Sequence, residues 1–300
     1  MEFEALVKDA VRAPSLHNSQ PWRFRLDGET IEVLLDRARV PPHGDPTGRL
    51  SRIACGAAAF NLALGLAVRG RPATIHPSTG DLVVARLVPT APRPPTPAQQ
   101  RLYRALPRRH SNRFPFEETP VPARIRDELV RAARDEGGRL DLLAGPSEVD
   151  AVAALLAEAD ATLGRDPAYR AELRVPPGSA GPAPDPTELL RRRDFGGTSQ
   201  AGRYETDPLV GVLSGPGDRP DDAVRAGVAL QRVLLTATAE RLAVSMFSQP
   251  VEVPAIRERL RVLAGHGHPP QLLLRFGYAL PLAPTPRRPA REVLDPATGG

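Results

Sequence analysis

Two short polar segments carry most of the residues that could do chemistry. The first, Ala13-Pro-Ser-Leu-His-Asn-Ser-Gln-Pro-Trp22, places hydroxyl and amide side chains between a predicted helix end and a predicted strand. The second, Arg109-His-Ser-Asn-Arg113, gathers guanidinium, imidazole and hydroxyl donors. Such donors bind anions, phosphate among them, through charge-assisted hydrogen bonds. Each segment also has a simpler interpretation, namely a helix end with a packed tryptophan and a solvated basic turn.

The residue types exclude several other kinds of site. Lys8 is the only lysine among 40 basic residues and follows no glycine-rich turn, so it fits neither a phosphate-binding loop nor a pyridoxal phosphate Schiff base. Cys55, the only cysteine, lies in an apolar run and is predicted to be a core residue, which leaves no intrachain disulfide and no cysteine cluster. His266 and His268 have no third ligand nearby, so a polar turn is expected there and no metal site.

The charge pattern bears on partners and on location. Forty basic and 35 acidic residues give a net charge of +5, and both signs are scattered along the chain, so no nucleic-acid partner is expected. The arginine excess fits either genomic base composition or an anion site built from arginines. An acidic N-terminus and an uncharged run that is short for a membrane span (Ile53–Val68) predict a soluble cytoplasmic protein with no membrane partner.

Proline divides the chain of 300 residues. Pro89–Pro97 reads as a stiff linker between a first half, 1–88, and a second half, 98–300. In the first half, periodicity predicts a helix that Pro14 ends, a hairpin and a further strand, with a long buried helix over 49–69. The predicted strands are Trp22–Leu26, Ile31–Leu35 and Leu82–Val88.

The second half has the same alternation of helices and strands on a larger scale, so the chain is predicted to be α+β in two similar halves. Its predicted helices are 98–106, 122–135, 147–162 and 221–242, and its predicted strands are 139–143, 209–213 and 271–278. The Gly-, Pro- and Arg-rich stretch 164–205 is predicted to be a loop with one short helix near 187–193. A loop this long is typical of a lid or of a disordered insertion.

Together the two polar segments resemble the FMN-dependent nitroreductase family, whose members carry Arg-Arg/His-Ser-x-Arg/Lys and Pro-Ser-x-x-Asn-x-Gln-Pro-Trp motifs. The second motif matches Pro14, Ser15, Asn18, Gln20, Pro21 and Trp22. The C-terminal stretch, Gln271–Tyr278 followed by Pro286–Pro289, is similar to the family's last strand and arginine arm. The arginine motif here lies in the other half from Pro-Ser-x-x-Asn, as in the Acg-type subgroup of fused pseudo-dimers.

The resemblance implies a nitroreductase-like fold. Each half would be a mainly antiparallel sheet with flanking helices, and 164–205 would be a lid-like insertion. The two motif-bearing halves would build one FMN site, so the chain would act as a monomer with an internal pseudo-dimer. The residues implied as FMN-binding are Pro14, Ser15, Asn18, Gln20, Arg109, His110, Ser111, Arg113, Ser248, Gln249, Pro250 and Arg287.

The resemblance also implies roles within the site. Arg109, Ser111 and Arg287 would hold the phosphate, and His110 would lie along the ribityl chain. Arg113 would face flavin N1 and O2, where a cation stabilises the charge of the reduced ring. The stretch 248–250 would pass near flavin N5, and Ser15, Asn18 and Gln20 would reach the cofactor from the first half.

Three functions follow as alternatives. The first is an FMN-dependent oxidoreductase that exchanges a hydride at N5 with a small-molecule substrate, with NAD(P)H as a candidate donor and no separate acid–base pair. The second is a protein of the Acg type that binds or sequesters FMN without turnover beneath a closed lid. The third is a structural protein with no cofactor, which would make the matching segments coincidental.

Overall fold

The computed structural model describes residues 3–143, 145–173, 190, 205–265, 267–280, 282 and 285–295. Strands in this part of the chain form two separate four-stranded antiparallel sheets, one in each half. The predicted α+β class with two similar halves is therefore confirmed. Most of the predicted insertion, including its short helix at 187–193, lies outside the described residues.

The first half contributes one sheet and two helices. Its elements are α1 (Phe3–Ala10), β1 (Trp22–Asp27), β2 (Thr30–Leu35), α2 (Arg49–Val68), β3 (Ala73–Pro77) and β4 (Val83–Pro89). The strand order is β1-β2-β4-β3. β1 and β2 form the predicted hairpin, in which Gly28 adopts a φ of 57° that glycine tolerates without strain. β3 was not predicted from the sequence.

The second half repeats this pattern and adds helices. Its elements are α3 (Pro97–Ala105), α4 (Ala123–Arg134), β5 (Arg139–Leu142), α5 (Pro146–Leu163), α6 (Pro167–Glu172), β6 (Leu209–Ser214), α7 (Pro220–Ala239), β7 (Ala243–Phe247), α8 (Gln249–Glu252), α9 (Pro254–Leu263) and β8 (Pro270–Gly277). The strand order is β5-β6-β8-β7. α6 begins within the predicted insertion, and β7 and α9 were not predicted.

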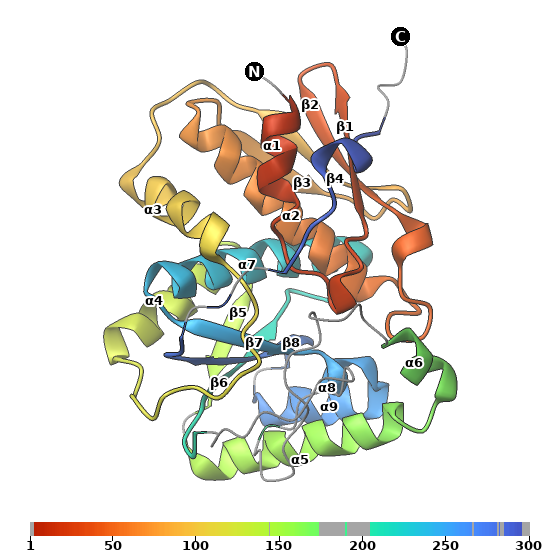
Figure 1. Cartoon of the computed structure of the whole chain (residues 1–300), viewed down its shortest axis with the longest axis vertical. Helices are drawn as coiled ribbons and strands as arrows, with labels where there is room; N and C mark the ends of the chain where they lie inside the picture. Colours follow the sequence, from red (N-terminus) through yellow and green to blue (C-terminus); the bar gives the residue numbers. More distant parts are fainter. Residues whose placement is uncertain are drawn as a thin grey trace.

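Two long helices, α2 and α7, join the halves at the centre of the molecule (Figure 1). They cross where Gly56 faces Gly227. A Cβ on Gly56 would lie 2.1 Å from the Val224 carbonyl oxygen, and a Cβ on Gly227 would lie 2.0 Å from that of Ile53. Only glycine allows backbones to approach this closely, so the crossing depends on both residues.

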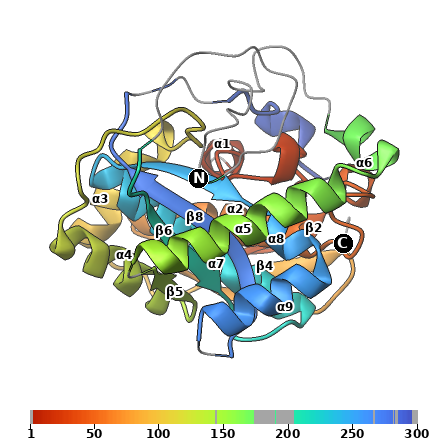
Figure 2. The same cartoon turned by 90° about the horizontal axis from the view of Figure 1, so that it is seen from below.

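The sheets and helices form layers around this crossing. The second sheet lies between α7 on one face and α5, α8 and α9 on the other, and α5 crosses in front of it when the molecule is seen from below (Figure 2). The first sheet packs with α1 and α2 into a second apolar cluster. Each half therefore has its own core, and the α2–α7 contact connects them.

By length and composition alone, α2 is long and apolar enough to cross a membrane. In the folded protein, 89% of its most apolar window is buried. Its burial on nearly all sides explains its lack of a polar face. Cys55 on this helix is fully buried, as predicted, and burial raises the pKa of its thiol.

The C-terminal arm returns to the first half. The Phe24 N–H donates to the Val293 carbonyl oxygen (2.8 Å), and Phe24 forms an isolated parallel bridge with Leu294. Ala290 and Val293 are buried in the core of the first half. The C-terminal arm therefore crosses from the second half back to the first, and it brings Arg287 against Ala13, in the segment that follows α1.

Candidate active site

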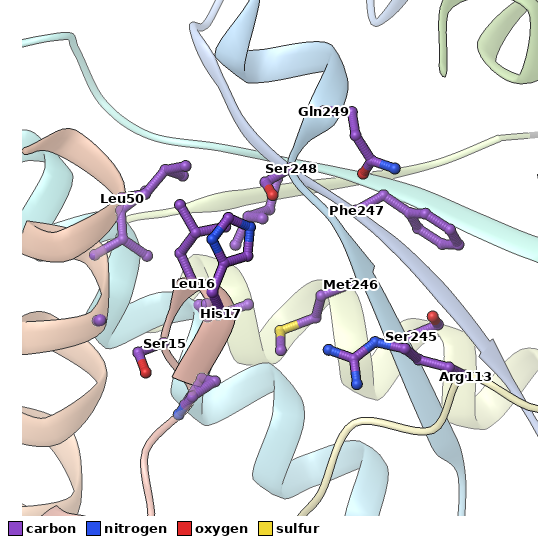
Figure 3. Close-up of a pocket in the computed structure, with 15 residues that line it drawn as sticks. Ser15, Leu16, His17, Leu50, Arg113, Ser245, Met246, Phe247, Ser248 and Gln249 are labelled. Carbon is purple, nitrogen blue, oxygen red and sulfur yellow. The ribbon is translucent and has the colours of Figure 1, made fainter. Parts of the chain in front are cut away.

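A cavity lies between the two halves, beside the start of α2 and the end of β7 (Figure 3). It encloses about 740 Å³, counting the part that opens to solvent. His17 and Leu16 stand on one side, Arg113 and Ser245 on the other, and Met246 projects between them. The lining residues are Pro14, Ser15, Leu16, His17, Leu50, Ile53, Ala54, Arg113, Leu230, Ser245, Met246, Phe247, Ser248, Gln249 and Leu272. The wall is thus mainly apolar with a few polar groups, as is usual for cofactor and substrate sites.

The segment between α1 and β1 reaches this cavity through an unusual backbone. His17, Asn18 and Gln20 have φ values of 50°, 55° and 51°, a region that costs non-glycine residues of the order of 1 kcal/mol each. The Ser15 hydroxyl accepts a hydrogen bond from the Gln20 N–H (2.9 Å), which fixes the turn. This conformation presents Pro14 to His17 to the cavity.

The arginine segment approaches from the second half along the edge of β7. Ser111 forms an isolated parallel bridge with Val244, and the Asn112 N–H donates to the Val244 carbonyl oxygen (2.9 Å). This edge pairing fixes the direction of the segment. Arg113 consequently lines the cavity next to Ser245, as Figure 3 shows.

Arg109, at the other end of the segment, lies in a cationic cluster with Arg12 and Arg287. Its side chain is buried, one guanidinium nitrogen donates to the Arg12 carbonyl oxygen (3.2 Å), and its Nε and Nη1 have no hydrogen-bond partner. Arg287 donates to the next carbonyl oxygen, that of Ala13 (3.3 Å). No carboxylate forms an ion pair with Arg109 or Arg287 within the described part of the chain.

Both arginines have lowered pKa values. Desolvation by burial, followed by the nearby charge of Arg287, lowers the pKa of Arg109 to about 9. Desolvation, followed by the charge of Arg12, lowers the pKa of Arg287 to about 10. Buried cations are costly without a counter-ion, and the described residues supply none, so a bound anion would stabilise this cluster.

The cationic cluster is connected to the cavity along both segments. The chain runs from the Arg12 and Ala13 carbonyls directly into Pro14, which lines the cavity. It also runs from Arg109 to Arg113, which lines it as well. A ligand with an anionic end and an apolar ring system fits this arrangement.

Three of the predicted residues contact the C-terminal arm. The Asn18 amide donates to the Pro286 carbonyl oxygen (3.1 Å), and Gln20 Oε1 accepts from the Arg288 N–H (2.8 Å). His110 Nε2 accepts from the Leu282 N–H (3.4 Å). None of the three lines the cavity, so in this structure they position the arm that carries Arg287.

The predicted stretch 248–250 lies partly at the cavity. Ser248 and Gln249 line it, and the Gln249 Nε2 atom is buried without a hydrogen-bond partner. Pro250 is buried behind them in α8. Gln249 therefore offers the cavity an unused donor.

Sequence reasoning did not assign several lining residues. Ser245, Met246 and Phe247 come from β7, whose short alternation was not recognised as a strand. His17 lies inside the Pro-Ser-x-x-Asn motif, and its position between two motif residues was the available signal. Leu230 on α7 lines the cavity only because of the helix crossing, for which the sequence carries no local signal.

We expect Gln20→Ala to loosen the arm. The substitution leaves the Arg288 N–H without its partner, and a lost hydrogen bond of this kind costs about 1–3 kcal/mol. Trypsin should then cleave after Arg291 about tenfold faster or more, since 1.4 kcal/mol is tenfold in an opening equilibrium. Mass spectrometry of timed digests measures this. Gln100→Ala, at an exposed position of α3, is the matched control, and equal cleavage rates in the two variants would contradict the assignment.

No protein-family model matches the chain. Several curated proteins, however, are similar to it in sequence. A Mycobacterium tuberculosis protein named "Putative NAD(P)H nitroreductase Rv3131" is 32% identical over 308 residues, which cover 95% of this chain and 89% of the relative. The chain belongs to the nitroreductase family.

A second curated relative agrees with this membership. The nitroreductase of the same organism named acg is 30% identical over 313 residues, covering 97% of this chain and 94% of that protein. Among solved structures, a nitroreductase with bound FMN from Desulfitobacterium hafniense has a TM-score of 0.44 and 15% identity over 63% of this chain and 94% of that chain. The resemblance inferred from the two motifs, including the Acg-type subgroup, is thus confirmed by relatives that span nearly the whole chain.

Proposed function

We propose that this nitroreductase binds one FMN per chain and works as an oxidoreductase that passes a hydride from NAD(P)H to a small organic acceptor. The observation that carries the proposal is Arg109. It is a buried guanidinium with two unpartnered nitrogens, it lies beside Arg287, and no acid among the described residues balances its charge. The dianionic phosphate of FMN supplies the missing counter-charge and acceptors.

The remaining residues fit the rest of the cofactor. The apolar wall formed by Ile53, Ala54, Leu230 and Leu272 can bury a flat ring system. Arg113 supplies a cation on one side of the cavity, which would stabilise negative charge on a reduced ring. The unused Gln249 amide would donate to a ring heteroatom.

When bound, FMN would supply the redox chemistry, namely hydride transfer between a donor and an acceptor. The protein's own residues bind the phosphate, hold a cation at the ring and exclude water with Met246 and Phe247. The NAD(P)H donor is taken from the names of the relatives, and the acceptor class follows from the small, mainly apolar cavity.

The α2–α7 contact supports the pseudo-dimer. Residues from both halves line the cavity, and both arginines of the cluster contact carbonyls near the end of α1. One chain can therefore complete the site by itself, so we infer a monomer. We place it in the cytoplasm, a reducing compartment that suits its single buried free thiol.

We expect the purified protein to be yellow and to carry about one FMN per chain by the family resemblance. Anaerobic NAD(P)H should bleach the visible flavin band of the same sample. Absorbance spectroscopy before and after the addition, with flavin quantified after denaturation, is the measurement.

The same spectra test the alternative. A band that persists with NAD(P)H and bleaches with dithionite would favour the non-catalytic, FMN-sequestering function or a different donor. A protein without a flavin band, even after incubation with FMN, would contradict the cofactor proposal itself.

A further inference from the structure

The two halves of the chain are related by an internal pseudo-symmetry. The sheets have equivalent strand orders, β1-β2-β4-β3 and β5-β6-β8-β7, and both are antiparallel throughout. Each of the two equivalent strand pairs, β2–β4 and β6–β8, contains one register shift. α2 and α7 exchange places across the reciprocal contact of Gly56 and Gly227. The elements that line the first cavity therefore have counterparts on the other side of the α2–α7 contact.

A second cavity lies at this counterpart position. The first cavity is lined by the α1–β1 segment, β7 and the helix pair, and the second is lined by the α4–β5 turn at Glu136, by β3 and by the same helix pair. Counted in the same way as the first cavity, with the part that opens to solvent, it encloses about 1070 Å³, well above the volume of one water molecule.

The floor of the second cavity is apolar. Phe60, Leu64, Leu102 and Val228 form it, and they belong to a third apolar cluster where α2, α3 and α7 meet. An open cavity with an apolar floor and polar groups around it is typical of a ligand site.

The mouth of the second cavity is cationic. Arg93, from the linker, forms no ion pair within the described residues. Arg225 has only long contacts, with its nitrogens 3.5 Å from an Asp221 carboxylate oxygen and 4.0 Å from one of Asp222. Both guanidinium groups are therefore able to bind an anionic group at the mouth.

The same mouth does not suit a flavin phosphate. Among the described residues that line it, none is a counterpart of the buried, unpartnered Arg109. Its third arginine, Arg232, is held by Glu136 and Asp135 at 2.7 Å each. The Glu136 carboxylate would repel a phosphate dianion, whereas a single carboxylate can bind at Arg93 and Arg225.

We propose that this second cavity is a binding site for a small anion with an apolar body, of the aromatic or short aliphatic carboxylate class. The apolar body lies against Phe60, Leu64 and Val228, and the carboxylate is held by Arg93 and Arg225. The site is distinct from the first cavity, and its ligand does not replace FMN.

The test is calorimetric titration of the protein as purified with naphthoate, with its neutral analogue naphthamide in parallel. We expect one naphthoate to bind per chain. The affinity for naphthamide should be weaker by about tenfold or more, because the charge-assisted bonds are lost. Arg93→Gln combined with Arg225→Gln should weaken naphthoate binding by a similar factor. Ala63→Leu, which fills part of the cavity, should weaken both probes.

Arg126→Gln combined with Arg131→Gln, at exposed positions of α4, is the matched control and should bind naphthoate normally. Flavin content, measured in every sample, separates this proposal from the cofactor proposal, which can fail independently. Non-saturable binding, equal affinity for both probes, or unchanged affinity in the cavity variants would overturn the second site. Release of flavin by naphthoate would also overturn it, because the probe would then occupy the first cavity.

Discussion

Replacing Arg109 by methionine is expected to weaken flavin binding strongly without destabilising the apoprotein. Methionine keeps the length and apolar contacts of the side chain but removes a buried cation that has two unpartnered nitrogens. A cation at this position costs desolvation energy until an anion binds. Removing this cation should therefore not lower the free energy of unfolding of the apoprotein, and could raise it by about 1 kcal/mol.

Flavin binding should respond in the opposite direction. In the proposed complex the phosphate accepts hydrogen bonds from Arg109 and Arg287 where water is excluded. Truncating one partner of such a buried charge pair costs about 2–5 kcal/mol, so the dissociation constant for FMN should rise roughly 30-fold or more. Arg109→Ala combined with Arg287→Ala should yield mostly apoprotein.

Flavin-fluorescence titration of apoprotein and urea denaturation of the same apoprotein measure the two effects. Arg126→Met, at an exposed position of α4, is the matched control and should change neither. A purely structural Arg109 would give the reverse result, with lower apoprotein stability and an unchanged affinity for FMN. That result would remove the main support for the phosphate site.

The arginine cluster also shows what the sequence alone could reveal. Arg109 and Arg287 are far apart in the chain, and composition alone leaves each as one of many arginines. The family resemblance paired them, and the structure places both against the carbonyls of Arg12 and Ala13, which follow α1. The roles of Asn18 and Gln20 could not be read in this way, because their partners are backbone atoms of the arm and not motif residues.

The helices and strands likewise divide into those that the sequence predicted and those that it did not. The long helices and the first hairpin were predictable because their signals are local, in apolar periodicity and in the turn at Asp27 and Gly28. β3 and β7 were missed because they are short edge strands of five residues each, and pairing with β4 and β8 defines them. Since β7 lines the cavity, the error over one short strand hid three residues of the site.

Gly227→Ala is expected to be among the most destabilising single substitutions at the interface of the halves. The new Cβ would lie 2.0 Å from the Ile53 carbonyl oxygen and 3.0 Å from the Ala57 nitrogen, and both are backbone atoms of a helix that cannot move alone. Overpacking a core costs about 1–3 kcal/mol and occasionally more. A contact of 2.0 Å with backbone belongs at the upper end of that range, and the better helix propensity of alanine returns at most about 1 kcal/mol, so a net loss of roughly 2 kcal/mol is expected.

Urea denaturation followed by circular dichroism measures this loss. Gly145→Ala is the control, because no atom lies within 4 Å of its Cβ position and its φ of −165° is ordinary extended backbone.

The same reasoning predicts that the losses of stability caused by Gly56→Ala and Gly227→Ala are not additive. Each substitution is relieved by the same separation of α2 from α7, so the double variant should lose less than the sum of the two single losses. Additive losses would mean that the two contacts yield independently, which is incompatible with one shared helix crossing.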